Sequence, residues 1–123
     1  MTTTQISILK QALAGAEDWM ATARDRSLDE QERREAAQNA DTTWHSIRTL
    51  AARLEEVCRQ EAAALDPQLK ALAPDDYSRK AIELDDLRRT WSDMADEMDA
   101  LSVKAATNAH VEKSLDSEIH DIS

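Results

Sequence analysis

Apolar side chains recur along residues 3–26 at alternating intervals of three and four. The positions are Ile6, Leu9, Leu13, Ala16, Met20 and Ala23. Because this spacing places side chains on one side of an α-helix, it predicts an amphipathic helix over about 3–26. Trp19 and Ala12 widen the apolar side. We therefore expect this helix to face two neighbours, with Trp19 packed against alanine patches.

A second helix is predicted over about 28–65. Ser27 is followed three residues later by Glu30, a spacing typical of the capping box at a helix start. The apolar positions that follow are Ala37, Ala40, Trp44, Ile47, Ala51, Leu54 and Cys58. Because a proline disfavours helical geometry in the residue before it, the helix is expected to end at Asp66 and Pro67.

Residues 66–74 form the predicted connector, and a third helix is predicted over about 75–109. Its apolar positions fit one heptad frame: Leu84, Leu87, Trp91, Met94, Met98, Leu101 and Ala105. The same frame continues through Leu115, Ile119 and Ile122. A continuation of this helix toward residue 122 therefore stays open.

These patterns predict an all-α fold that forms a single helical domain over 1–123. A spacing near 3.5 residues is the period of left-handed coiled-coil packing. We expect an elongated antiparallel three-helix bundle, or long helical hairpin, with coiled-coil (heptad) packing. With turns near residues 27 and 70, position 44 is predicted to lie opposite about 97 and about 10.

The first helix is too short to cover the whole hairpin. It is expected to reach only position 50 of the second helix, which leaves an apolar edge formed by Leu54, Val57, Leu65, Leu84 and Leu87. Exposed apolar patches mark interaction surfaces. We expect a homodimer or a partner protein to cover this edge, with Leu115, Ile119 and Ile122 as a second contact surface.

Composition supports helices and sets the charge of a partner. One Gly and two Pro in 123 residues exclude most β folds, whose turns draw on these residues. The net charge is −10, and the acidic excess lies mainly in the second half. Nucleic-acid binding and membrane binding depend on basic clusters, so neither is expected. A partner protein with a basic surface is favoured.

Several carboxylates are predicted to share the outer face of the third helix: Asp86, Asp93, Asp96, Glu97 and Asp99. Repeated carboxylates on a rigid rod can imitate a phosphate backbone. The interleaved Arg88 and Arg89 instead favour a solvated face with intrahelical ion pairs such as Asp85 with Arg89. The five acids are the candidate partner-binding face.

The sequence offers no catalytic constellation. Cys58, the only cysteine, stands in the apolar pattern and is expected to be a buried thiol. Phosphate-binding loops need glycines that the chain lacks. His110, Glu112, Glu118 and His120 have no specific metal-ligand spacing. We predict no enzyme activity, no cofactor and no metal. Since neither a signal peptide nor an apolar span is recognisable, a cytoplasmic location is expected.

The predicted function is that of a non-enzymatic interaction protein that presents helix surfaces to a partner protein. It could act as an adaptor, a chaperone-like cofactor or an inhibitor. The alternative is an acidic nucleic-acid mimic that inhibits a nucleic-acid-binding complex, as phage-type anti-defence or anti-CRISPR-like inhibitors do.

Overall fold

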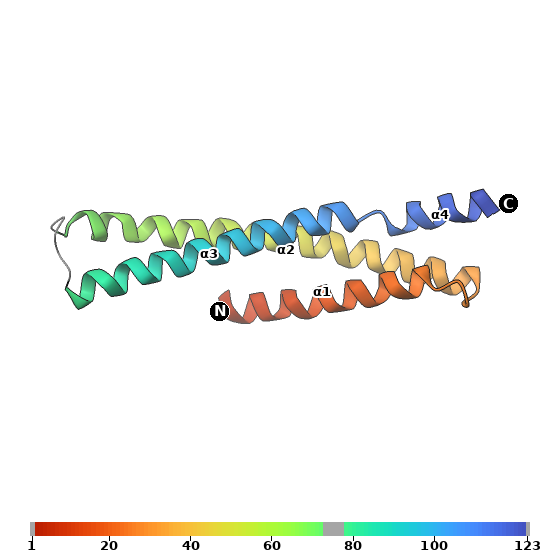
Figure 1. Cartoon of the computed structure of the whole chain (residues 1–123), viewed down its shortest axis with the longest axis horizontal. Helices are drawn as coiled ribbons and strands as arrows, with labels where there is room; N and C mark the ends of the chain where they lie inside the picture. The colour runs from red at the N-terminus through yellow and green to blue at the C-terminus, as the bar shows by residue number, and fades with distance from the viewer. Residues whose placement is uncertain (1, 73–77, 123) are drawn as a thin grey trace.

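The computed structural model describes residues 2–72 and 78–122 and is all-α. Its helices are α1 (Thr2–Arg24), α2 (Glu30–Lys70), α3 (Arg79–Asn108) and α4 (Val111–Ile122). The helices α2 and α3 form a long antiparallel hairpin, and α1 folds back along the first half of α2 (Figure 1). The predicted elongated helical hairpin with a packed third helix is confirmed. No described helix is both long and apolar enough to cross a membrane.

The core lies where α1 covers the hairpin. Its largest fully buried side chains are Trp44, Leu9, Ile47 and Met98. Cys58 is also fully buried but does not belong to this cluster. Many of the remaining buried positions are alanines, which let helix backbones approach closely around the large Trp44 ring. The first half of α3 contributes little, because the buried residues of this helix are Ala95, Met98 and Ala105. Burial is therefore uneven along the rod.

The prediction that Trp19 packs into this core is wrong. It is 42% exposed, whereas the neighbouring Ala16 and Ala23 are buried. The line from Ile6 to Ala23 alone is enough to bury α1 against its neighbours, so Trp19 stays at the outer edge.

The start of α2 is two residues later than the predicted capping box. Asp29 is the N-cap, and its carboxylate accepts a hydrogen bond from the backbone N–H of Glu32 at 2.8 Å. Ser27 instead donates its hydroxyl to Asp25 Oδ1 at 2.6 Å. Aspartate caps a helix as well as serine does, so the Ser27 prediction is wrong because a second suitable cap follows it.

The connector prediction fails at its first residues, because α2 continues through Pro67 to Lys70. Proline lacks the N–H that would bond to the preceding turn, but its fixed φ is compatible with a helix. The last turn closes behind it, with the Ala71 N–H donating to the Pro67 carbonyl at 3.1 Å. The remaining connector residues 73–74 and the predicted helix start at 75 lie outside the described residues. The described part of α3 begins at Arg79, with Ser78 as its N-cap.

The later turn shifts the register of the hairpin. Arg59 lies beside Asp96 at 3.5 Å, and Arg88 lies beside Asp66 at 3.4 Å. Near the other end of the hairpin, the Asp41 carboxylate contacts the backbone of Val111. Position 44 therefore lies near the start of α4, whereas the sequence predicted that it would lie opposite 97.

The third helix does not run unbroken to residue 122. It ends at Asn108, whose side-chain amide donates to the Lys104 carbonyl at 2.9 Å. After Ala109 and His110, α4 begins at Val111. The Asp41 carboxylate holds this start by accepting from the N–H groups of Val111 at 2.7 Å and Glu112 at 3.0 Å. A cap supplied from α2 thus lets a separate short helix form.

Candidate interaction surfaces

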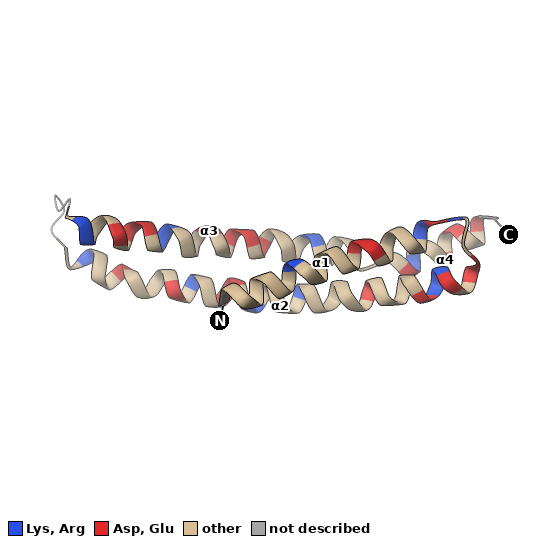
Figure 2. Ribbon diagram, turned by 90° about the horizontal axis from the view of Figure 1, so that it is seen from below, with Lys and Arg blue, Asp and Glu red and all other residues tan. Residues whose placement is uncertain are grey.

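The five acids predicted on the outer face of α3 are all exposed. Asp96 pairs with Arg59 of α2 at 3.5 Å, and Glu97 pairs with Lys10 of α1 at 3.3 Å. Because these partners belong to different helices, Asp96 lies toward α2 and Glu97 lies toward α1. Asp86, Asp93 and Asp99 complete the set, and acidic positions recur along much of α3 (Figure 2).

Arginines neutralise part of this acidic surface. Asp85 pairs with Arg88 at 3.3 Å and with Arg89 at 3.1 Å, as predicted for Arg89. Glu83 pairs with Arg79 at 3.1 Å. Surface pairs of this kind contribute little to stability, about 0–1 kcal/mol each. Because these arginines lie among the acids, the surface of α3 alternates in charge and is not uniformly anionic.

The predicted apolar edge is present in part. Val57 is 38% exposed and Leu87 is 44% exposed, while Leu65 and Leu84 are half-buried. Leu54 is only 2% exposed and belongs to the core cluster that contains Ile6 and Leu9. Its assignment to the exposed edge is therefore wrong, because Leu54 is buried in line with Ala51 and Cys58 on α2. We call the remaining four residues, Val57, Leu65, Leu84 and Leu87, the distal groove.

The distal groove continues the surface on which α1 packs. On α2, Val57 follows the half-buried Leu50 by seven residues, two helical turns. On α3, Leu87 precedes Met94 and Leu101, both packed against the core, by seven and fourteen residues. Leu50, Met94 and Leu101 are half-buried, whereas Val57 and Leu87 are exposed. The helix α1 runs along only part of the hairpin (Figure 1). The exposure of Val57 and Leu87 therefore results from the shortness of α1.

Most of the predicted C-terminal apolar surface is buried within the chain. Leu115 is 3% exposed, and Ile119 is partly buried against the core cluster. The side chain of Ile122 lies outside the described residues. Leu115 is therefore not available to a partner, because α4 packs on α2 and α1 instead of extending away from them.

A charged cluster fastens α4 to the rest of the chain. Arg33 is 7% exposed, and its Nε donates to the Ala23 carbonyl at 2.9 Å while its terminal nitrogen bonds to Glu118 at 2.6 Å. Glu118 also accepts from Arg26 at 2.7 Å. One buried arginine thus joins the end of α1, the start of α2 and α4. The sequence analysis missed this residue, although Arg33 stands four positions before Ala37 on the apolar line of α2.

The surroundings of two groups in and near this region alter their acidity. The hydrogen bond from Arg33 lowers the pKa of the Glu118 carboxyl below its ordinary value of 4.5. Hydrogen bonds from Ser27 lower the pKa of Asp25 below 3.8. Both carboxylates are therefore held in their charged form by the fold.

Cys58 is fully buried, as predicted from its place in the apolar pattern. Burial raises the pKa of its thiol above 9.0. The reactive thiolate is therefore disfavoured, and Cys58 packs as a small apolar side chain.

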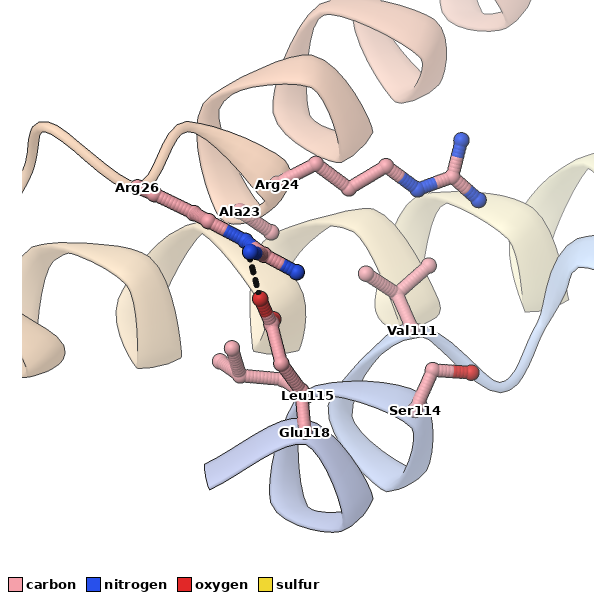
Figure 3. Close-up of a pocket in the computed structure, with 7 residues that line it drawn as sticks. All are labelled: Ala23, Arg24, Arg26, Val111, Ser114, Leu115 and Glu118. Atoms are coloured by element: carbon pink, nitrogen blue, oxygen red, sulfur yellow. Dashed lines mark ion pairs between the residues drawn. The ribbon is translucent and has the colours of Figure 1, made fainter. Parts of the chain in front are cut away.

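A small hollow of about 270 Å³ lies where the end of α1 meets α4 (Figure 3). The side chain of Arg26 reaches across it to Glu118, and Arg24 extends away from that pair (Figure 3). Its lining is Ala23, Arg24, Arg26, Val111, Ser114, Leu115 and Glu118. The hollow belongs to the fastening of α4, since Val111 and Leu115 supply its apolar wall.

Metal ligands and known relatives add no further site. Within residues 2–72 and 78–122, no three His, Cys, Asp or Glu side chains come together to hold a metal ion. Compared with known proteins, the chain matches no family model, no curated protein and no solved structure at a significant level.

Proposed function

We propose that this chain is a non-enzymatic interaction protein whose distal groove receives an amphipathic helix of a partner protein. The exposure of Val57 and Leu87, on the two lines that α1 covers elsewhere, carries this proposal. Two antiparallel helices with apolar side chains at their junction form the kind of groove into which a helix packs.

The length of the groove supports a helical occupant. α2 contains 41 residues and α1 contains 23. At 1.5 Å per residue these helices are about 61 and about 35 Å long, so about 26 Å of the hairpin extends beyond α1. A partner helix of about 17 residues would continue the line of α1 along this length.

Charge favours a basic partner. Residues 67–123 carry 13 acidic against 7 basic side chains, and Glu83 and Asp86 flank Leu84 and Leu87 in sequence. Like charges facing one another across an interface cost several kcal/mol, so an acidic helix is disfavoured.

With a partner helix in the distal groove, the protein would act as an adaptor, a chaperone-like cofactor or an inhibitor. The buried thiol suits the reducing cytoplasm, where we place it.

A model peptide tests the groove directly. The probe is a fluorescent 17-residue helix with leucines at heptad a and d positions and lysines elsewhere, and a scrambled peptide of the same composition is the control. Val57→Glu and Leu87→Glu should each weaken binding of the helical peptide at least tenfold. Val103→Glu is the matched variant, because Val103 is 59% exposed elsewhere on α3. Equal binding of both peptides, or unchanged binding by the groove variants, would contradict the proposal.

The same assay separates the alternative, an acidic nucleic-acid mimic. A mimic binds through carboxylates, so its affinity for a basic nucleic-acid-binding protein should fall steeply with salt. It should also fall when Asp86, Asp93 and Asp99, all exposed, become asparagine. Loss of peptide binding in this triple variant, together with wild-type affinity in Val57→Glu, would favour the mimic over the groove.

A further inference from the structure

A second line of mostly apolar positions runs along one flank of α1, beside the line that packs into the core, and its Ala12 still contacts the core cluster. Its positions are Gln5, Ile8, Ala12, Gly15, Trp19 and Thr22, spaced alternately by three and four. Ile8 is 54% exposed and Trp19 is 42% exposed, while Ala12 and Gly15 are partly exposed between them. A Cβ added at Gly15 would meet nothing within 4 Å. Open space therefore lies over the middle of this line.

The order of side chains along this line is symmetric. From either end it runs polar, large, small, small, large, polar. If two copies of α1 lie antiparallel, Ile8 falls opposite the partner's Trp19, and Ala12 falls opposite the partner's Gly15. Small central residues let two helices approach closely, and the large side chains then fill the space on both sides. Such self-complementarity is what a two-fold symmetric interface requires.

Charge also selects this line over other surfaces for self-association. Residues 1–26 carry three basic and three acidic side chains, so the whole net charge of −10 belongs to residues 27–123. Lys10 and Glu17 pair with Glu97 and Lys104 of α3. They lie on the opposite side of α1 from Gly15 and Ala12 and stay outside the contact. Contact through α1 thus brings a neutral surface against its copy, whereas the distal groove would oppose acidic residues.

We propose that α1 binds a second copy of this chain through an antiparallel, two-fold symmetric contact centred between Ala12 and Gly15. The homodimer expected from the sequence is thereby placed on α1 and leaves the distal groove to another protein. The apolar contact from Ile8 to Trp19 is only about 17 Å long. Small interfaces are typical of transient complexes, so the dimer should form reversibly at high micromolar concentration.

Sedimentation equilibrium over a concentration series tests the dimer. Gly15→Glu should raise the dissociation constant at least tenfold without unfolding the monomer, since the site is open and glutamate favours a helix more than glycine does. Trp19→Glu is the second variant, and Val103→Glu is the matched control that should dimerise normally. Circular dichroism verifies that each variant is folded. A wild-type chain that stays monomeric at millimolar concentration would overturn the proposal, as would dimerisation lost in Val57→Glu but kept in Gly15→Glu.

Disulfide trapping tests the antiparallel order. Gln5 and Thr22 stand at opposite ends of the line, and Cys58 is buried and protected from oxidation. When Gln5→Cys and Thr22→Cys chains are mixed and oxidised, the mixed disulfide should form faster than either homodisulfide. Preferential Gln5→Cys homodisulfide formation would indicate a parallel contact and overturn the arrangement.

Discussion

The two tryptophans Trp44 and Trp19 lie in opposite environments, one in the core and one at the surface. Trp44 is fully buried in the core cluster, whereas Trp19 is 42% exposed. The Trp44 indole Nε1 has no hydrogen-bond partner among the described residues. A buried donor without a partner costs about 1–3 kcal/mol, so this ring is retained for its volume and not for its polar group.

Truncating the two rings should therefore have different effects on stability. Trp44→Ala should lower the free energy of unfolding by about 3–5 kcal/mol, because it leaves a large cavity in the core. Trp19→Ala should change it by less than about 0.5 kcal/mol, as is usual for surface positions. Trp44→Phe should cost clearly less than Trp44→Ala, since it keeps most of the ring and removes the unsatisfied N–H. Urea unfolding of the monomer measures all three, and similar losses at both positions would contradict this assignment.

At the scale of helices, apolar periodicity predicts the existence of α1, α2 and α3 but not where they begin and end. Capping depends on single polar side chains that compete locally, as Ser27 and Asp29 do. Proline normally ends a helix, yet α2 continues through Pro67 for one more turn, because the fixed φ of proline is compatible with helical geometry. These few residues move the turn, and the turn sets the register of the whole hairpin.

The fastening of α4 could not be predicted for a related reason. Asp41 and Val111 are separated by 70 residues, and Arg33 and Glu118 by 85. Such contacts arise from the register and leave no local pattern in the sequence. Of the candidate site, Val57 and Leu87 follow from periodicity, whereas the burial of Leu54 and Leu115 depends on how the helices pack on one another.

Acid should weaken the fastening of α4. Because the pKa of Glu118 is lowered in the folded chain, its carboxylate stabilises the fold above its unfolded pKa, and this contribution is lost as pH falls through the folded value. The free energy of unfolding should therefore fall as the pH drops below the ordinary glutamate pKa of about 4.5. Glu118→Gln should be less stable than wild type at pH 7 and should show a flatter decline. Asp121→Asn, at an exposed position on α4, is the control. Parallel pH profiles for Glu118→Gln and wild type would contradict the role of this ion pair.

On the scale of the whole molecule, the rod has two unequal halves. Beside α1, the hairpin encloses Trp44, Ile47 and Met98. Beyond α1, the two helices pack on each other, and α3 before Ala95 contains no fully buried residue. Apolar burial is the dominant favourable contribution to folding, so local stability should decrease from the α4 end toward the distal groove.

Amide hydrogen exchange should show this gradient directly. Amides in 37–54 of α2 should exchange only through global unfolding, whereas those in 60–70 of α2 and 82–90 of α3 should open locally and exchange faster. Exchange is compared as protection factors, which correct for the intrinsic rate of each amide. Binding of the amphipathic peptide should raise protection in the two distal segments and leave 37–54 unchanged, because a third helix there supplies the apolar contacts that α1 supplies elsewhere. Uniform protection along α2 in the absence of peptide would show that the half beyond α1 is as stable as the half that α1 covers. The distal groove would then gain no stability from a third helix, which would contradict this prediction.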